Sequence, residues 1–308
     1  MGTDFKDPMN QPATVKRARS AEAAPPTAVI SYSGATGKGN MLITRPTSVV
    51  GGSSRMGSVV AIHSFRGGTG KSSLTASLAY CCASAGARVG VVDTDIQSPG
   101  IHILFGLGHS AARHCLNDYL RGRCTIKDAV HDISGKLSLP EGRMSLIPSR
   151  LNAEAIVAML KEGFDVQRLS TAFSDLTKEL QLDILLVDTH PGVEEDTLLS
   201  IAMCDILVVI LRPDEQDYLG TAVTFEIARR MEVPKTFLIA NRIPSELDME
   251  QLAARLEKTY KVSVVGVFPF SYGLMMAQSK QVYSFAYPND PFSLAIKATA
   301  EKILKSCQ

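Results

Sequence analysis

Short apolar runs without an alternation of inward and outward residues place the strongest constraint on the fold of this 308-residue chain. Strands buried on both faces have this pattern, which is typical of parallel sheets covered by helices. Seven such runs follow residue 57: VVAIHSF (59–65), ARVGVVDTD (87–95), RMSLIPS (143–149), LDILLVDT (182–189), DILVVILRP (205–213), PKTFLIANR (234–242) and SVVGVFPF (263–270). Amphipathic segments between them predict helices at 70–85, 152–162, 165–180, 214–231 and 246–259. The pattern predicts one α/β domain over 58–308, a doubly wound, mostly parallel sheet flanked by helices.

Residues 1–57 differ in composition from the rest of the chain. They are rich in Ala, Pro, Gly, Ser and Thr, so burial cannot offset the entropy of ordering them, and we expect a mostly disordered tail. The tail holds seven of the 32 basic residues but only three of the 31 acidic ones. Its KRAR cluster (16–19) is a candidate contact for an anionic partner. GATGKG (34–39) imitates a phosphate loop, but we expect neither a strand before it nor a helix after it.

The sequence also predicts where the protein is found. Residues 1–10 are polar, and the longest apolar runs, such as ILVVIL (206–211), have the length of a strand rather than of a membrane span. We expect a cytoplasmic protein. Its six cysteines include no C-x-x-C pair, which favours reduced, packed thiols over a zinc or iron–sulfur site.

The stretch SFRGGTGKSS (64–73) joins the first predicted strand to the first predicted helix, which is the context of a phosphate-binding loop. Small residues let backbone N–H groups converge on phosphate oxygens, and the helix N-terminus and Lys71 add positive charge. A purely structural glycine turn would explain neither Lys71 nor Ser72. We therefore predict a nucleotide site formed by Gly67, Gly68, Thr69, Gly70, Lys71, Ser72 and Ser73.

Polar side chains follow three other predicted strands. Asp93 and Asp95 end one strand and Asp188 ends another, where carboxylates can organise Mg²⁺-bound waters or the attacking water. A turn or helix-cap role fits Asp93 nearly as well. Asn241 closes a further strand, and its amide offers both a donor and an acceptor to an adenine ring. A residue that only closes the strand remains the alternative for Asn241.

These motifs together resemble a known family. RGGTGKSS (66–73) resembles the deviant Walker A loop, K-G-G-x-G-K-[ST]-[ST], of the MinD/ParA ATPases, which does not require the glycine that Phe65 replaces. The resemblance continues in order through VVDTDIQSPG (91–100), LDILLVDTHPG (182–192), ILRPDEQ (210–216), LIANR (238–242) and GVFPFSYGLMMAQSKQVYSF (266–285).

The resemblance implies ATP and Mg²⁺ as cofactors and assigns roles to individual residues. Lys71 and Asp95 are the expected catalytic residues. Ser72, Asp93 and Asp188 are the candidate magnesium ligands, and Asn241, Pro269 and Phe270 are expected around the base. Gly192 matches the second switch segment, whereas His190 departs from the small residue common there. We interpret His190 as a packing or solvent-facing residue.

Arg66 replaces a lysine that, in the family, reaches across a dimer interface to the partner's phosphates. Arginine keeps the charge and adds a planar fork suited to bidentate phosphate contact, so we expect Arg66 to act in catalysis across the interface. A loop arginine without such a role is the alternative.

The implied function is that of an ATPase switch, slow and stimulated by a partner, that forms an ATP-dependent sandwich homodimer and positions or partitions a cargo such as DNA or the division or surface machinery. Two alternatives stay open: a metallocluster-maturation or metal-insertion ATPase, for which Cys115 and Cys124 lack a paired motif, and a non-hydrolysing nucleotide-dependent scaffold. An activating protein is the expected partner, with the tail as one contact. Non-specific DNA binding stays open, as does association of the protein with the nucleoid or its recruitment to a cell pole. Direct membrane binding is disfavoured, because 291–308 reads as the ordinary closing helix.

Overall fold

The computed structural model describes residues 29–33, 40–44, 57–108, 113–139, 141–150 and 166–308. Within these residues the main sheet has eight strands in the order β10-β9-β8-β3-β7-β4-β6-β5. All neighbouring strands are parallel except β5 and β6, which are antiparallel. The strands are β3 (Ser58–His63), β4 (Arg88–Asp93), β5 (His131–Asp132), β6 (Arg143–Ile147), β7 (Ile184–Asp188), β8 (Ile206–Leu211), β9 (Lys235–Ile243) and β10 (Ser263–Pro269). The predicted mostly parallel, doubly wound sheet is confirmed.

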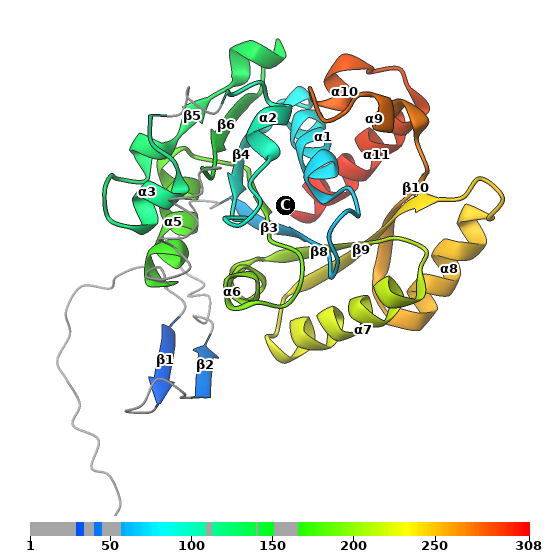
Figure 1. The fold of residues 1–308 in the computed structure, drawn as a ribbon, viewed down its shortest axis with the longest axis horizontal. Coiled ribbons are helices and arrows are strands. Elements are labelled where there is room, and N and C mark those ends of the chain that lie inside the picture. The colour runs from blue at the N-terminus through cyan, green and yellow to red at the C-terminus, as the bar shows by residue number, and fades with distance from the viewer. Residues whose placement is uncertain (1–28, 34–39, 45–56, 109–112, 140, 151–165) are drawn as a thin grey trace, which may run out of the picture.

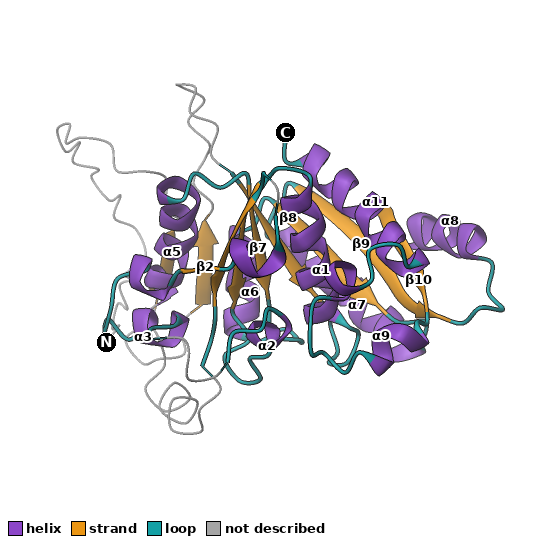
Figure 2. Ribbon diagram, turned by 90° about the horizontal axis from the view of Figure 1, so that it is seen from above, coloured by secondary structure: helices purple, strands orange, loops and turns teal. Residues whose placement is uncertain are grey.

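Helices cover both faces of this sheet (Figure 1, Figure 2). Buried residues of α1, α10 and α11 belong to one apolar cluster, and buried residues of α3, α5, α6, α7 and α8 belong to a second. The helices are α1 (Lys71–Ser84), α2 (Ile101–Leu104), α3 (Leu116–Leu120), α5 (Val166–Glu179), α6 (Glu195–Met203), α7 (Glu215–Arg230), α8 (Met249–Tyr260), α9 (Tyr272–Met276), α10 (Tyr283–Ala286) and α11 (Pro291–Ser306), with 3-10 turns η1 (Lys127–Ala129) and η2 (Ser134–Leu137).

The unalternating strands supply side chains to both clusters. On β8, Ile206 and Val208 belong to the cluster that includes α1, whereas Leu207 and Val209 belong to the other, and all four are at most 1% exposed. Each such side chain contributes about 1.5–3 kcal/mol by burial. A central strand therefore has to be apolar at every position, which is the pattern seen in the sequence.

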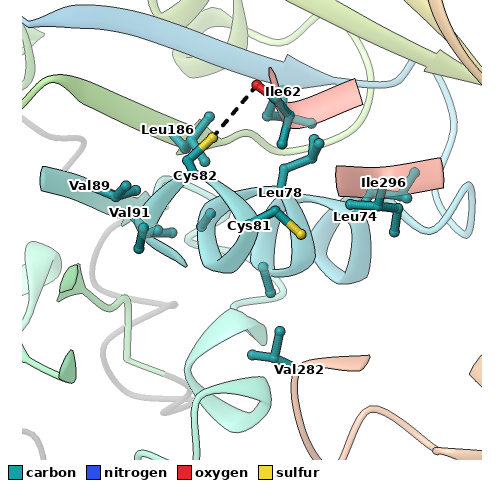
Figure 3. Packing of buried hydrophobic residues seen from close by; sticks show 14 of the residues in the cluster. Ile62, Leu74, Leu78, Cys81, Cys82, Val89, Val91, Leu186, Val282 and Ile296 are labelled. Atoms are coloured by element: carbon teal, nitrogen blue, oxygen red, sulfur yellow. Dashed lines mark hydrogen bonds between the residues drawn. The ribbon is translucent and has the colours of Figure 1, made fainter. Parts of the chain in front are cut away.

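Helix α1 is buried over most of its surface, because it packs on the sheet and also against α10 and α11 (Figure 3). Leu74, Leu78, Cys81 and Cys82 all belong to the first of the two apolar clusters. Burial raises the pKa of the Cys81 thiol to about 11 and raises that of Cys82 as well. The six cysteines form no disulfide in the described part of the chain. These two cysteines thus pack as small apolar residues.

The predicted elements correspond to observed ones over most of the domain. All seven predicted strands are present, and the helices expected at 70–85, 165–180, 214–231 and 246–259 are α1, α5, α7 and α8. The helix expected at 152–162 lies outside the described residues. The segment expected to close the fold forms α11. No helix in the described ranges has both the length and the apolar character to cross a membrane.

Within residues 1–57, which we expected to be a mostly disordered tail, the structure describes two strands. β1 (Val29–Ser33) and β2 (Asn40–Thr44) pair in antiparallel orientation. They flank GATGKG (34–39), which itself lies outside the described residues. A strand does precede this segment, contrary to our expectation. Because a strand and not a helix follows it, it still lacks the setting of a phosphate loop.

Candidate nucleotide-binding site

The loop between β3 and α1 has the backbone of a phosphate cradle. Gly68 and Gly70 have φ values of 76° and 90°, in the left-handed region that favours glycine. A Cβ on Gly70 would lie only 2.7 Å from the Asn241 side-chain nitrogen. No side chain caps the N-terminus of α1, so its first turn presents N–H groups toward the loop. Such a helix start binds anions.

Lys71, the first residue of α1, points to the end of β7. Its Nζ donates a hydrogen bond to Asp188 Oδ1 at 2.8 Å, and the two side chains are 7% and 1% exposed. Thr75 Oγ1 donates to the same oxygen at 3.2 Å. The structure thus brings together two residues that the sequence placed 117 positions apart, a lysine for phosphate and an acid for magnesium.

Carboxylates concentrate at this edge because β4 and β7 are neighbours. Asp93 pairs in register with Asp188 and is fully buried. Its carboxylate accepts hydrogen bonds from the backbone N–H groups of Asp95 and Gly100, at 3.1 and 3.3 Å. Burial, together with the negative charges of Asp188 and Asp95, raises the pKa of Asp93 well above its usual range. Asp93 therefore stabilises the loop that follows β4. The carboxylates at this edge also repel one another, and a bound cation would reduce that repulsion.

A metal at this edge would depend on more than protein ligands. Among the described residues, no three His, Cys, Asp or Glu side chains are arranged to hold a metal ion. Mg²⁺ beside a nucleotide takes only one or two carboxylates and completes its shell with phosphate oxygens and water. Asp188, with Ser72 half-buried at the start of α1, fits that requirement.

Asp95 has a partner that the sequence did not predict. His190 Nδ1 lies 2.8 Å from Asp95 Oδ1, and the side chains are 15% and 10% exposed. Burial opposes ionisation of Asp95, but the hydrogen bond from His190 and the charge of Lys71 outweigh it and lower its pKa. The same hydrogen bond raises the pKa of His190. His190 is therefore not the packing or solvent-facing residue we expected, and its place at the carboxyl end of β7 was the signal available in the sequence.

A pocket of about 260 Å³ adjoins the phosphate loop. Asn241 is 1% exposed, and its Nδ2 donates to the carbonyl of Thr69 at 2.8 Å. The Thr69 hydroxyl is buried and has no hydrogen-bond partner among the described residues. Pro269 ends β10 beside the pocket without lining it. The lining residues are Gly70, Ser73, Asn241, Arg242, Phe270, Ser271, Leu274, Met275, Gln278, Ser279 and Phe292.

Phe65 and Arg66 connect the loop to α7. The Phe65 ring lies against Gly220, where a Cβ would overlap it. Arg66 Nη1 lies 3.6 Å from Oδ1 of Asp214, the N-cap residue of α7, and both side chains are 42% exposed. Arg212 also pairs with Asp214, at 3.2 Å. Phe65 thus anchors the loop where the strict motif would have a glycine, and Arg66 stays accessible.

Solved structures share this fold. The structure matches Pyrococcus furiosus cell division ATPase MinD with a TM-score of 0.68 and 20% identity, covering 82% of this chain and all of that one. It matches the septum site-determining protein MinD of Pyrococcus horikoshii, solved with Mg-ADP, with a TM-score of 0.68 and 18% identity, covering 80% of this chain and 96% of that one.

Sequence relatives have several functions. An uncharacterized ATP-binding protein of Methanocaldococcus jannaschii is 29% identical over 81% of this chain and 88% of its own length. The antiactivator FleN of Pseudomonas aeruginosa is 26% identical over 80% of this chain and 85% of its own length. An iron-sulfur cluster carrier protein of P. furiosus is 23% identical over 80% of this chain and 85% of its own length. The sequence profile of the ParA family, described as NUBPL iron-transfer P-loop NTPase, matches residues 55–304. With its loop, strand order and acidic edge, the chain therefore belongs to the ParA family of P-loop NTPases.

Proposed function

We propose that this protein binds ATP with Mg²⁺ and hydrolyses it slowly, as a switch that dimerises in its ATP-bound form and positions a cellular cargo. The observation that carries the proposal is the buried contact between Lys71 and Asp188 at an uncapped helix start. A lysine at this place supplies positive charge to phosphates, and an acid supplies a magnesium ligand. The buried, unpartnered hydroxyl of Thr69 adds a free polar group to the same loop.

The residues divide the chemistry among them in this proposal. The N–H groups of the loop and Lys71 hold the phosphates, and Lys71 exchanges its contact with Asp188 for one with phosphate oxygens. Ser72 and Asp188 hold the magnesium ion, with Asp93 as a further candidate, and the ion neutralises phosphate charge. Asn241 and Phe270 bound the pocket for the base. Asp95 orients the water whose oxygen bonds to the γ-phosphorus as the bond to the bridging oxygen breaks and ADP leaves.

Arg66 is proposed to act on the nucleotide of the other protomer. Its ion pair with Asp214 is exposed and 3.6 Å long, and such pairs contribute only about 0–1 kcal/mol. Arg66 can therefore leave Asp214 at little cost when a second copy approaches. A contact of this kind stabilises the charge of the transition state.

Two kinds of relative support different cargoes. FleN is named an antiactivator, and MinD a cell division ATPase, which favours a positioning or regulatory switch. The iron-sulfur carrier relatives favour the metallocluster alternative. Cys115 does not support it: burial raises the pKa of this thiol, which lies 3.2 Å from Asp118 Oδ2. Burial raises the pKa of Cys124 to about 11. Among the described residues, neither cysteine belongs to a group of three His, Cys, Asp or Glu side chains that could hold a metal ion.

Phosphate release by purified protein tests the proposal. The wild type should release phosphate from Mg-ATP, and Asp95→Ala should bind ATP but release at least about 100-fold less phosphate. Binding without release by the wild type would favour the non-hydrolysing scaffold. Metal analysis of anaerobically purified protein tests the metallocluster-maturation or metal-insertion alternative, which predicts bound metal.

A further inference from the structure

Two segments that follow neighbouring strands are held together by side chains. One is 93–100, after β4, and the other is 188–197, after β7. Thr94 donates from its backbone N–H and its hydroxyl to the carbonyl of Asp188, at 2.9 and 3.1 Å. Further out, Gln97 Nε2 donates to Glu194 Oε2 at 2.8 Å, and the Asp95–His190 contact lies between these two links.

The contact fixes one oxygen of Asp95 and leaves the other available. Asp95 Oδ1 lies 2.8 Å from His190 Nδ1 and accepts the backbone N–H of Ser98 at 2.9 Å. The described residues give Oδ2 no hydrogen bond. His190 is itself held, because its carbonyl accepts the hydroxyl of Thr197 at 3.2 Å. Two donors on one oxygen fix the orientation of the carboxylate plane, and with it the direction in which the other oxygen can accept a hydrogen bond.

We propose that His190 is a positioning residue for hydrolysis: it holds Oδ1 of Asp95 so that Oδ2 faces the attacking water. This inference rests on the proposed function. A neutral imidazole with its hydrogen on Nδ1 can also donate this hydrogen bond, so the contact does not require a charged His190. A small residue at position 190 could not reach Asp95, so the histidine that departs from the family pattern has a definite task.

Two substitutions test the task of His190. His190→Ala removes the donor, whereas His190→Asn keeps one, because the amide nitrogen of asparagine occupies nearly the place of Nδ1. Gln97→Ala is the matched control, since it removes the neighbouring link between the same segments without touching Asp95. Single-turnover hydrolysis at saturating Mg-ATP gives the rate of the chemical step, and fluorescence of a labelled ATP gives the affinity.

We expect His190→Ala to lose about 100-fold in hydrolysis rate, the scale of a misplaced catalytic group, with ATP affinity within about twofold of the wild type. His190→Asn should recover most of the rate, and Gln97→Ala should stay within about twofold.

Three results would overturn the inference while leaving the proposed function intact: an unchanged rate in His190→Ala, equal losses in His190→Ala and His190→Asn, or an equal loss in Gln97→Ala. A wild type that binds ATP but releases no phosphate would instead end the hydrolysis proposal, and this inference with it.

Discussion

Lys71 and Asp188 form a buried ion pair, so removing either side chain leaves the charge of its partner uncompensated. Breaking such a pair costs about 3–5 kcal/mol, whereas replacing both partners with apolar residues is often neutral. We expect Lys71→Met to lose stability by that amount and to lose ATP binding. The double substitution Lys71→Met/Asp188→Leu should recover most of the stability but not the binding. Urea unfolding and nucleotide titration of the variants measure the two effects. A Lys71→Met variant as stable as the wild type would show that the pair is not buried in solution.

His63, the last residue of β3, gives the protein a pH-dependent stability. Burial and nearby Lys71 lower its pKa to about 3, while its Nδ1 lies 2.9 Å from the Thr189 hydroxyl. Below pH ~6.5, His63 binds a proton in the unfolded chain but stays neutral in the folded chain. The free energy of unfolding therefore falls on acidification by up to about 1.4 kcal/mol per pH unit. His190, whose pKa is raised, acts in the opposite direction.

The difference in unfolding free energy between wild type and His63→Asn, measured from pH 7 to 5, isolates the effect of His63. Asparagine preserves a polar contact with Thr189 but does not titrate. The difference should shift in favour of His63→Asn as the pH falls. Parallel pH profiles would contradict a neutral, buried His63.

Single residues also mark the limit of what the sequence predicted. Lys71, Asp93 and Asp188 were expected near one another because parallel strands end at the same edge of a sheet. The position of His190 just after β7 indicates this edge of the sheet, but its contact with Asp95 depends on side-chain rotamers in two irregular segments. The hydrogen bond from the Asn241 side chain to the Thr69 carbonyl could not be predicted either, because it joins positions 172 apart in the chain.

Helix α7 tests the packing of the phosphate loop through Gly220. A glycine inside a helix is about 1 kcal/mol less favourable than alanine, so helix propensity alone predicts that Gly220→Ala stabilises. The Phe65 ring occupies the place of the new Cβ, and overpacking typically costs about 1–3 kcal/mol. We expect destabilisation, with a smaller penalty for the same change in a Phe65→Ala background. Thermal unfolding of the wild type, the two single variants and the double variant measures this. A raised Tm for Gly220→Ala alone would contradict the contact.

Among the elements, the strands and long helices could be predicted because their apolar pattern repeats over enough residues. β5 has two residues and α2 four, too few for any periodicity. Helix α6 (Glu195–Met203) was missed because it directly follows the loop that we assigned to the second switch. β1 and β2 were missed because their surroundings are rich in Gly, Pro and Ser, which outweighed two short runs of strand-forming residues.

The whole molecule is proposed to work as a dimer, and Arg66 gives a direct test. Arg66→Ala should bind ATP as a monomer with affinity within about twofold of the wild type, because the Arg66 side chain pairs with Asp214 at the start of α7. It should lose ATP-dependent dimerisation or most of the hydrolysis rate. Arg66→Lys, which restores the residue usual in the MinD/ParA ATPases, is the control. Light scattering and phosphate release are the readouts. Equal dimerisation and turnover in Arg66→Ala would remove the role across the interface.

Titration of the folded protein with Mg-ATP in a calorimeter, beside the same titration of Lys71→Ala, tests the central claim most directly. The wild type should release heat on binding one nucleotide per chain, and the variant should release none while its circular dichroism still shows a folded protein. No heat from well-folded wild type, or the same binding curve from both proteins, would contradict a nucleotide site at the start of α1.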